Sequence, residues 1–207
     1  MRIAVARTAL AAAGLAVVGL TGSSFAATTP VAPKATVMTD PAGDTAAGVA
    51  PGDIVKLTFT SAGTTVAKKY TPKAVVISME LQDAIDTSGT TLYEIDANLP
   101  GCSYFTLVTQ PGSQVGDYSS CGSESSDPTA TGTDLGATAD IQGKVITWTL
   151  PFASLPDQLK AGATFDTISA VTGTVDPVEG AGPYLLSIFG LPGANDTLTS
   201  DQTYKIG

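Results

Sequence analysis

The chain has 207 residues, and its 19 acidic side chains outnumber its 10 basic ones. It contains no histidine, which excludes a Ser-His-Asp triad and leaves the chain without the side chain that most often transfers protons near neutral pH. The negative charge makes nucleic acid and anionic lipid surfaces unfavourable partners.

The N-terminus carries the features of a secretory signal. Arg2 and Arg7 precede an apolar run over residues 9–20, and Ser24 and Ala26 are the small residues that signal peptidases require before the cut. We therefore predict a signal peptide over residues 1–26 and a secreted, extracellular protein without membrane insertion. Cleavage would remove both arginines and leave 8 lysines against 19 acids, a net charge of −11.

The rest of the chain predicts a leader over residues 27–36 and one domain over residues 37–207. Short runs of alternating or β-branched residues, separated by Gly, Pro, Asp and Ser clusters, indicate an all-β antiparallel sandwich, jelly-roll or Ig-like, of about seven to nine strands. The clearest strands are residues 53–60, 74–82, 91–99, 103–110, 144–150, 165–175 and 203–206.

Strands 74–82 and 91–99 are predicted to form a hairpin. Each has apolar side chains at alternate positions, so one face of each would be buried. This pairing would place Glu80 and Glu94 opposite one another on the outer face. Two close carboxylates are the arrangement found in retaining glycosidases, so a glycosidase is the third and least favoured functional hypothesis. The alternative is that these acidic side chains only form a solvated face of the sheet.

Asp40, Asp44 and Asp53 are the candidate metal ligands. They are separated by small, flexible residues, and calcium binds six to eight oxygen ligands from carboxylates, carbonyls and water. The alternative is a purely structural turn in which Gly43 adopts a positive φ and Asp44 caps a backbone amide.

Cys102 and Cys121 are the only cysteines, and in an exported protein such a pair is predicted to form a disulfide. The bridge would tie a long loop to the sheet.

Further along the chain, Trp148 shares a strand face with Ile146 and Leu150, which favours a core position over a sugar-stacking one. The one predicted helix is a turn or two beginning at Ser154 as N-cap.

Two Gly- and Ser-rich segments, residues 111–140 and 176–200, are predicted to be loops. Tyr104, Tyr118 and Tyr184 are the candidate ligand-facing aromatic residues, because two of them lie in or beside these loops. The alternative is that these tyrosines only cover one end of the sandwich.

The motif Asp40-Pro41-x-Gly43-Asp44, followed by Asp53-Ile54 and, far downstream, by residues 145–155, resembles the DOMON-like or family-9-carbohydrate-binding-module-like sandwiches of bacterial exported proteins. The resemblance implies a two-sheet antiparallel sandwich. This chain departs from sugar-binding members because it has a single tryptophan.

These observations predict a non-catalytic, secreted or cell-envelope module that binds a neutral ligand such as a glycan and is stabilised by calcium. The alternative from a different class is a structural or protein-interaction domain without a small-molecule ligand. For that alternative, a bare sheet edge or an apolar patch such as residues 185–191 would be the contact surface.

Overall fold

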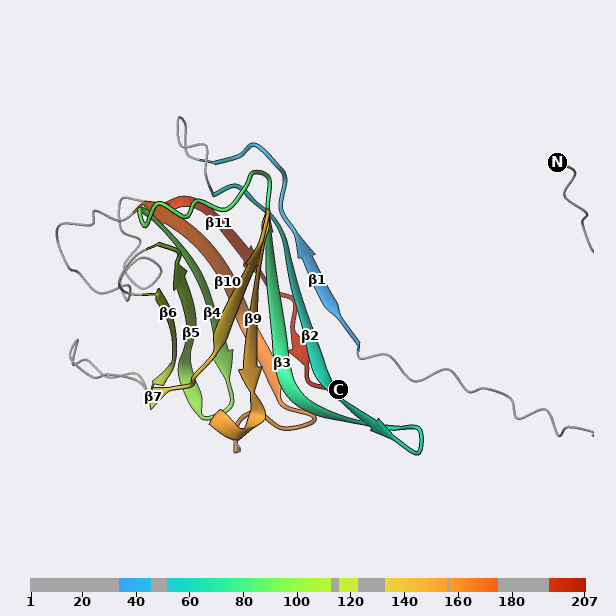
Figure 1. Cartoon of the computed structure of the whole chain (residues 1–207). Helices are drawn as coiled ribbons and strands as arrows, with labels where there is room; N and C mark the ends of the chain where they lie inside the picture. Colours follow the sequence, from blue (N-terminus) through green and yellow to red (C-terminus); the bar gives the residue numbers. More distant parts are fainter. Residues whose placement is uncertain (1–33, 46–51, 113–115, 123–132, 156, 175–193) are drawn as a thin grey trace, which may run out of the picture.

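The computed structural model describes residues 34–45, 52–112, 116–122, 133–155, 157–174 and 194–207 (Figure 1). The predicted signal peptide and most of the predicted leader therefore lie outside the described residues. So do Tyr184 and the suspected apolar patch. The described part of the chain contains no helix with the length and apolar character needed to cross a membrane.

Two antiparallel sheets build the molecule, as the sequence predicts (Figure 1). In order across the first sheet, the strands are β1 (Thr36–Thr39), β2 (Ile54–Val66), β3 (Lys69–Leu81), β9 (Val145–Pro151) and β8 (Thr138–Gln142). In the second sheet the order is β11 (Ala194–Ser200), β10 (Thr164–Thr174), β4 (Thr91–Leu99), β5 (Cys102–Gln110), β6 (Gly116–Gly122) and β7 (Thr133–Asp134), with β12 (Tyr204–Lys205) also paired to β10.

The core lies between the sheets because each strand turns alternate apolar side chains inward. Phe59 of the first sheet packs 5.6 Å, centroid to centroid, from both Phe165 and Tyr204 of the second. Trp148 is buried, which confirms the predicted core position, and its indole N–H donates to Thr109 Oγ1 across the sandwich at 2.9 Å. Burial of these rings supplies the main driving force that holds the two sheets together.

The predicted hairpin of residues 74–82 and 91–99 is wrong. β3 pairs with β2 and β9, whereas β4 pairs with β5 and β10 in the other sheet. The segment between them is a crossover, in which Asp86 accepts hydrogen bonds from Ser88, Thr90 and Thr91. Alternation of apolar and polar residues indicates only that one face of a strand is buried. The same alternation is found in two strands that pair within a sheet and in two strands that face each other from opposite sheets.

Five strands fall wholly or largely outside the predicted set: β1, β6, β7, β8 and β11. Four of them lie mainly in the segments predicted as loops. These segments are rich in Ser, Thr, Asp and Gly, which are uncommon in strands or hide the alternation of apolar and polar residues. The predicted helix is instead a 3₁₀ turn, η1 (Phe152–Ser154), preceded by Pro151. Ser154 is its last residue and not its N-cap, because the fixed φ of Pro151, −65°, already starts the turn.

The Cys102–Cys121 disulfide is present, with the two Cα atoms 5.3 Å apart. It joins the first residue of β5 to β6, so it links two neighbouring strands instead of tying a loop to the sheet.

Reducing this disulfide should lower the free energy of unfolding by about 3 kcal/mol, because the bridge restricts the unfolded chain. Urea unfolding with and without reductant measures the change. In a Cys102→Ala/Cys121→Ala variant the reductant should have no effect. An unchanged midpoint in the reduced wild-type chain would contradict the prediction.

Candidate metal centre

Two of the predicted ligands are brought together by the pairing of β1 with β2. Asp40 follows β1, and its amide N–H donates to the Val55 carbonyl at 3.2 Å, which extends the ladder by one bond. Asp53 immediately precedes β2. Because the strands are antiparallel, the end of β1 and the start of β2 lie at the same end of the sheet.

The turn after Asp40 folds Asp44 back over this end of the sheet. Gly43 has a φ of +90°, a conformation that side chains other than glycine rarely adopt. The Gly43 amide N–H donates to Asp53 Oδ2 at 2.6 Å, which fixes the turn against the start of β2.

The fourth carboxylate comes from the other sheet. Asp196 lies on β11, and its Oδ2 accepts the Ile54 amide N–H at 2.6 Å, while its Oδ1 accepts the Thr197 N–H at 2.8 Å. These bonds attach the start of β2 to β11 at one edge of the sandwich.

Gly52 allows this close approach between the two sheets. A Cβ on Gly52 would lie 2.7 Å from Thr172 Oγ1, the hydroxyl that donates to the Gly52 carbonyl. A larger residue at this position would therefore push Asp53 and the start of β2 away from Thr172 on β10.

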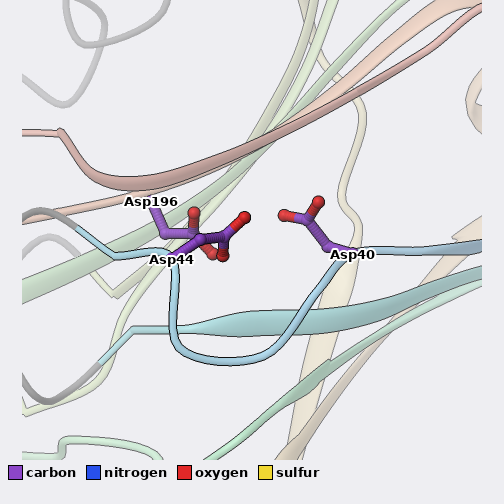
Figure 2. Close-up of side chains that lie close together, drawn as sticks. All are labelled: Asp40, Asp44 and Asp196. Atoms are coloured by element: carbon purple, nitrogen blue, oxygen red, sulfur yellow. The ribbon is translucent and has the colours of Figure 1, made fainter.

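Asp40, Asp44 and Asp196 each place a carboxylate oxygen within 4.8 Å of the other two. Figure 2 shows the Asp40 carboxylate pointing across the turn toward Asp44 and Asp196. Asp44 is exposed and Asp196 is buried, so the cluster spans from the surface into the edge of the sandwich.

Asp53 adds a buried carboxylate beside this cluster. Its exposed fraction is 5%, and its Oδ1 has no hydrogen-bond partner. Asp40 Oδ2 is likewise buried and without a partner. An unsatisfied buried carboxylate oxygen costs several kcal/mol in general, so two at one place require a compensating group.

The four carboxylates repel each other. Burial raises the pKa of Asp40 above its ordinary value of 3.8, and the charges of Asp196, Asp44 and Asp53 raise it further. Burial also raises the pKa of Asp196, again with help from Asp44 and Asp53, although the two backbone amides act in the opposite direction. Within the described residues the one ion pair joins Lys56 and Glu80, so no lysine neutralises this cluster.

This arrangement fits a hard divalent cation. Asp40, Asp44 and Asp196 would supply carboxylate oxygens, and Asp53 would either bind directly or balance the charge. The two buried oxygens without partners are the observation that supports the fit.

Of the predicted ligands, Asp40 and Asp44 belong to the three-carboxylate group, whereas Asp53 lies beside it. Asp196 was missed. It is 142 residues from Ile54, whose amide it binds, and no sequence motif joins the two regions. The structural alternative is also partly present, because Gly43 has the expected positive φ, but Asp53 and not Asp44 accepts its amide.

The other candidate residues are dispersed. Tyr104 lies on β5 and Tyr118 on β6, but their side chains, like all of Tyr184, are outside what the structure describes. Glu80 lies on β3 and Glu94 on β4, in different sheets, so the proposed carboxylate pair is wrong for the reason that the hairpin is wrong.

The pH dependence of stability should report the raised pKa values. Without a cation and between pH 3.8 and the raised pKa values, the folded chain retains protons on Asp40 and Asp196 that the unfolded chain has lost. Their contribution to stability should therefore fall as the pH rises from 3.8 through the raised pKa values. Asp86 acts in the opposite sense, because hydrogen bonds, first that of Thr91, lower its pKa.

Urea unfolding in EDTA from about pH 4 to pH 7 isolates this effect when the wild type is compared with Asp40→Asn. The variant should gain stability relative to the wild type as the pH rises. A constant difference across this range would contradict the prediction.

Comparisons of this chain with protein-family models, with curated protein sequences and with solved structures found no match.

Proposed function

We propose that this chain is a non-catalytic secreted module whose folded state is stabilised by calcium at Asp40, Asp44, Asp53 and Asp196. The proposal depends on one observation: carboxylates from both sheets converge at one edge of the sandwich without a lysine partner among the described residues. A cation would remove their mutual repulsion and satisfy the buried oxygens.

Calcium suits this donor set better than other common ions. The side chains offer oxygen only, because the chain has no histidine and both cysteines are in the disulfide. Zinc prefers nitrogen and sulfur ligands. Magnesium requires a near-ideal octahedron, whereas calcium accepts the irregular geometry of a turn that also offers backbone carbonyls.

The bound ion would hold together segments that are distant in the sequence. Asp40 and Asp44 belong to the connection between β1 and β2 in one sheet, and Asp196 belongs to β11 in the other. Calcium would thus close the edge of the sandwich at which β1 ends and β11 begins, and its loss should loosen this edge first.

A neutral ligand such as a glycan is the second part of the proposal. A hollow of about 210 Å³ is lined by three residues of β10 and by three at the end of β11, namely Thr167, Ile168, Ser169, Thr199, Ser200 and Asp201. Hydroxyl and carboxylate groups of this kind hydrogen-bond to the hydroxyls of neutral sugars. The proposal that the chain is non-catalytic is supported by the separation of Glu80 from Glu94.

The test is a thermal melt of the mature, oxidised chain with calcium or EDTA, repeated with a panel of neutral glycans. Calcium at a hundred times its Kd should stabilise the chain by about 2.7 kcal/mol, which for a domain of this size raises the Tm by about 5–10 °C. A glycan that binds should raise the Tm further, and Ser169→Ala should reduce that second increase. An unchanged Tm with calcium would overturn the calcium proposal.

Replacing Asp44 separates calcium binding from folding. Asp44 is exposed, and removing one of four repelling charges should leave the cation-free chain at least as stable as the wild type at neutral pH. Asp44→Asn should nevertheless lose most of the calcium-induced rise in Tm. Asp83→Asn, an exposed aspartate in the connection after β3, is the matched control and should keep the full rise. Equal calcium responses in the two variants would argue against the site.

A further inference from the structure

The β2–β3 hairpin extends beyond the body of the sandwich as a narrow arm, which we define as residues 62–73 (Figure 1). The pairing of β2 with β1 ends at Phe59, and that of β3 with β9 begins at Ala74. Among the described strands, the two halves of the arm therefore pair only with each other, and both edges lack a neighbouring strand.

The arm is cationic in a strongly acidic chain. It contains Lys68, Lys69 and Lys73 and no acidic residue, whereas the predicted mature chain has a net charge of −11. The tip lies four residues beyond Ala62, about 13 Å at the rise of a strand. This exceeds the Debye length of about 8 Å at physiological ionic strength, so the tip lysines act largely independently of the acidic body.

The tip is built for exposure. Val66 is 72% exposed, and it is one of two large apolar side chains that the described residues expose. Ala67 and Lys68 form the two-residue turn with φ values of 47° and 71°. Such a turn normally uses Asn or Gly, because a positive φ is unfavourable for other residues. The arm therefore keeps a lysine and an apolar residue at its tip at the expense of local stability.

An apolar hollow of about 420 Å³ lies at the base of the arm. Thr71 and Pro72 of the arm form one wall, and the opposite wall comes from η1 and the turn after it, through Phe152, Ala153, Leu159, Lys160 and Ala161. Lys160 adds a fourth cationic side chain beside the arm. A volume of this size accommodates one or two apolar side chains.

We propose that the arm and this hollow bind an acidic segment of a separate protein, whose carboxylates pair with Lys68, Lys69 and Lys73 while an apolar side chain enters the hollow. Charge complementarity selects an acidic partner, and the bare edges of the arm suit the backbone of an extended polypeptide. A phosphate polymer would use the lysines but would leave the hollow and Val66 without a partner.

A second copy of this chain fits the arm less well. The oxygens of Asp40 and Asp53 that lack a hydrogen-bond partner are buried, so a second copy could not offer them to the lysines of the arm. Two mature chains of charge −11 would also repel each other.

The test uses the full mature, oxidised chain and a fluorescent peptide of alternating glutamate and leucine. The affinity is measured by anisotropy with calcium and with EDTA. The peptide should bind equally in both, which separates this proposal from the cation site. Lys68→Glu/Lys69→Glu should weaken binding about tenfold, since water screens exposed ion pairs and each contributes only modestly. Lys56→Glu/Lys144→Glu is the control with the same change in net charge at the end of the sheet opposite the arm, and it should retain most of the affinity.

A second variant examines the hollow. Ala153→Phe places a ring at an exposed position that lines the hollow, so it should weaken the glutamate–leucine peptide but not a polyglutamate peptide. The proposal would be overturned if the peptide did not bind, or if both lysine variants lost the same affinity. It would also be overturned if inorganic polyphosphate bound at least as well as the peptide and Ala153→Phe did not change that binding. Self-association of the chain that Lys68→Glu/Lys69→Glu abolishes would instead assign the arm to a second copy.

Discussion

Packing of the two apolar sheet faces against each other is the interaction on which the rest of this molecule depends. Phe59, Phe105, Phe165 and Tyr204 form a continuous aromatic group between the sheets, and Trp148 adds a hydrogen bond across the same space. This packing fixes how the sheets lie relative to each other. It therefore also fixes which side chains meet at the ends and edges of the sandwich, where the polar chemistry is found.

At one edge the packing brings together groups that repel each other. The start of β2 is hydrogen-bonded to Asp196 of β11, and the same contact places Asp196 beside Asp40 and Asp44. Burial and repulsion raise the pKa values of Asp40 and Asp196, which means that holding these carboxylates together in their charged form destabilises the folded state. Such a cost is usual for a binding site, and a divalent cation is the group that would offset it.

The cationic arm does the opposite, because it keeps unlike charges apart. Its lysines are held away from the acidic body by the length of a hairpin that neither β1 nor β9 covers. Gly63 allows the two strands of the hairpin to approach each other closely, since a Cβ at this position would lie 2.2 Å from the Thr71 carbonyl oxygen. The hydroxyl of Tyr70 donates to the Ser61 carbonyl at 2.8 Å and braces the base of the arm. A braced arm loses little conformational entropy on binding, which favours a role in recognition.

The sequence by itself determined the all-β class, the disulfide, the buried tryptophan and the pair Asp40 and Asp44, because alternation, cysteine number and local turn residues are properties of neighbouring positions. Only the tertiary structure decided that β3 and β4 lie in opposite sheets, since alternation is identical in strands that pair and strands that face each other. It also decided that Asp196 joins the cluster, because that contact spans 142 residues. It decided the arm as well, because β1 and β9 end before residues 62–73 and leave the two halves of the arm paired only with each other.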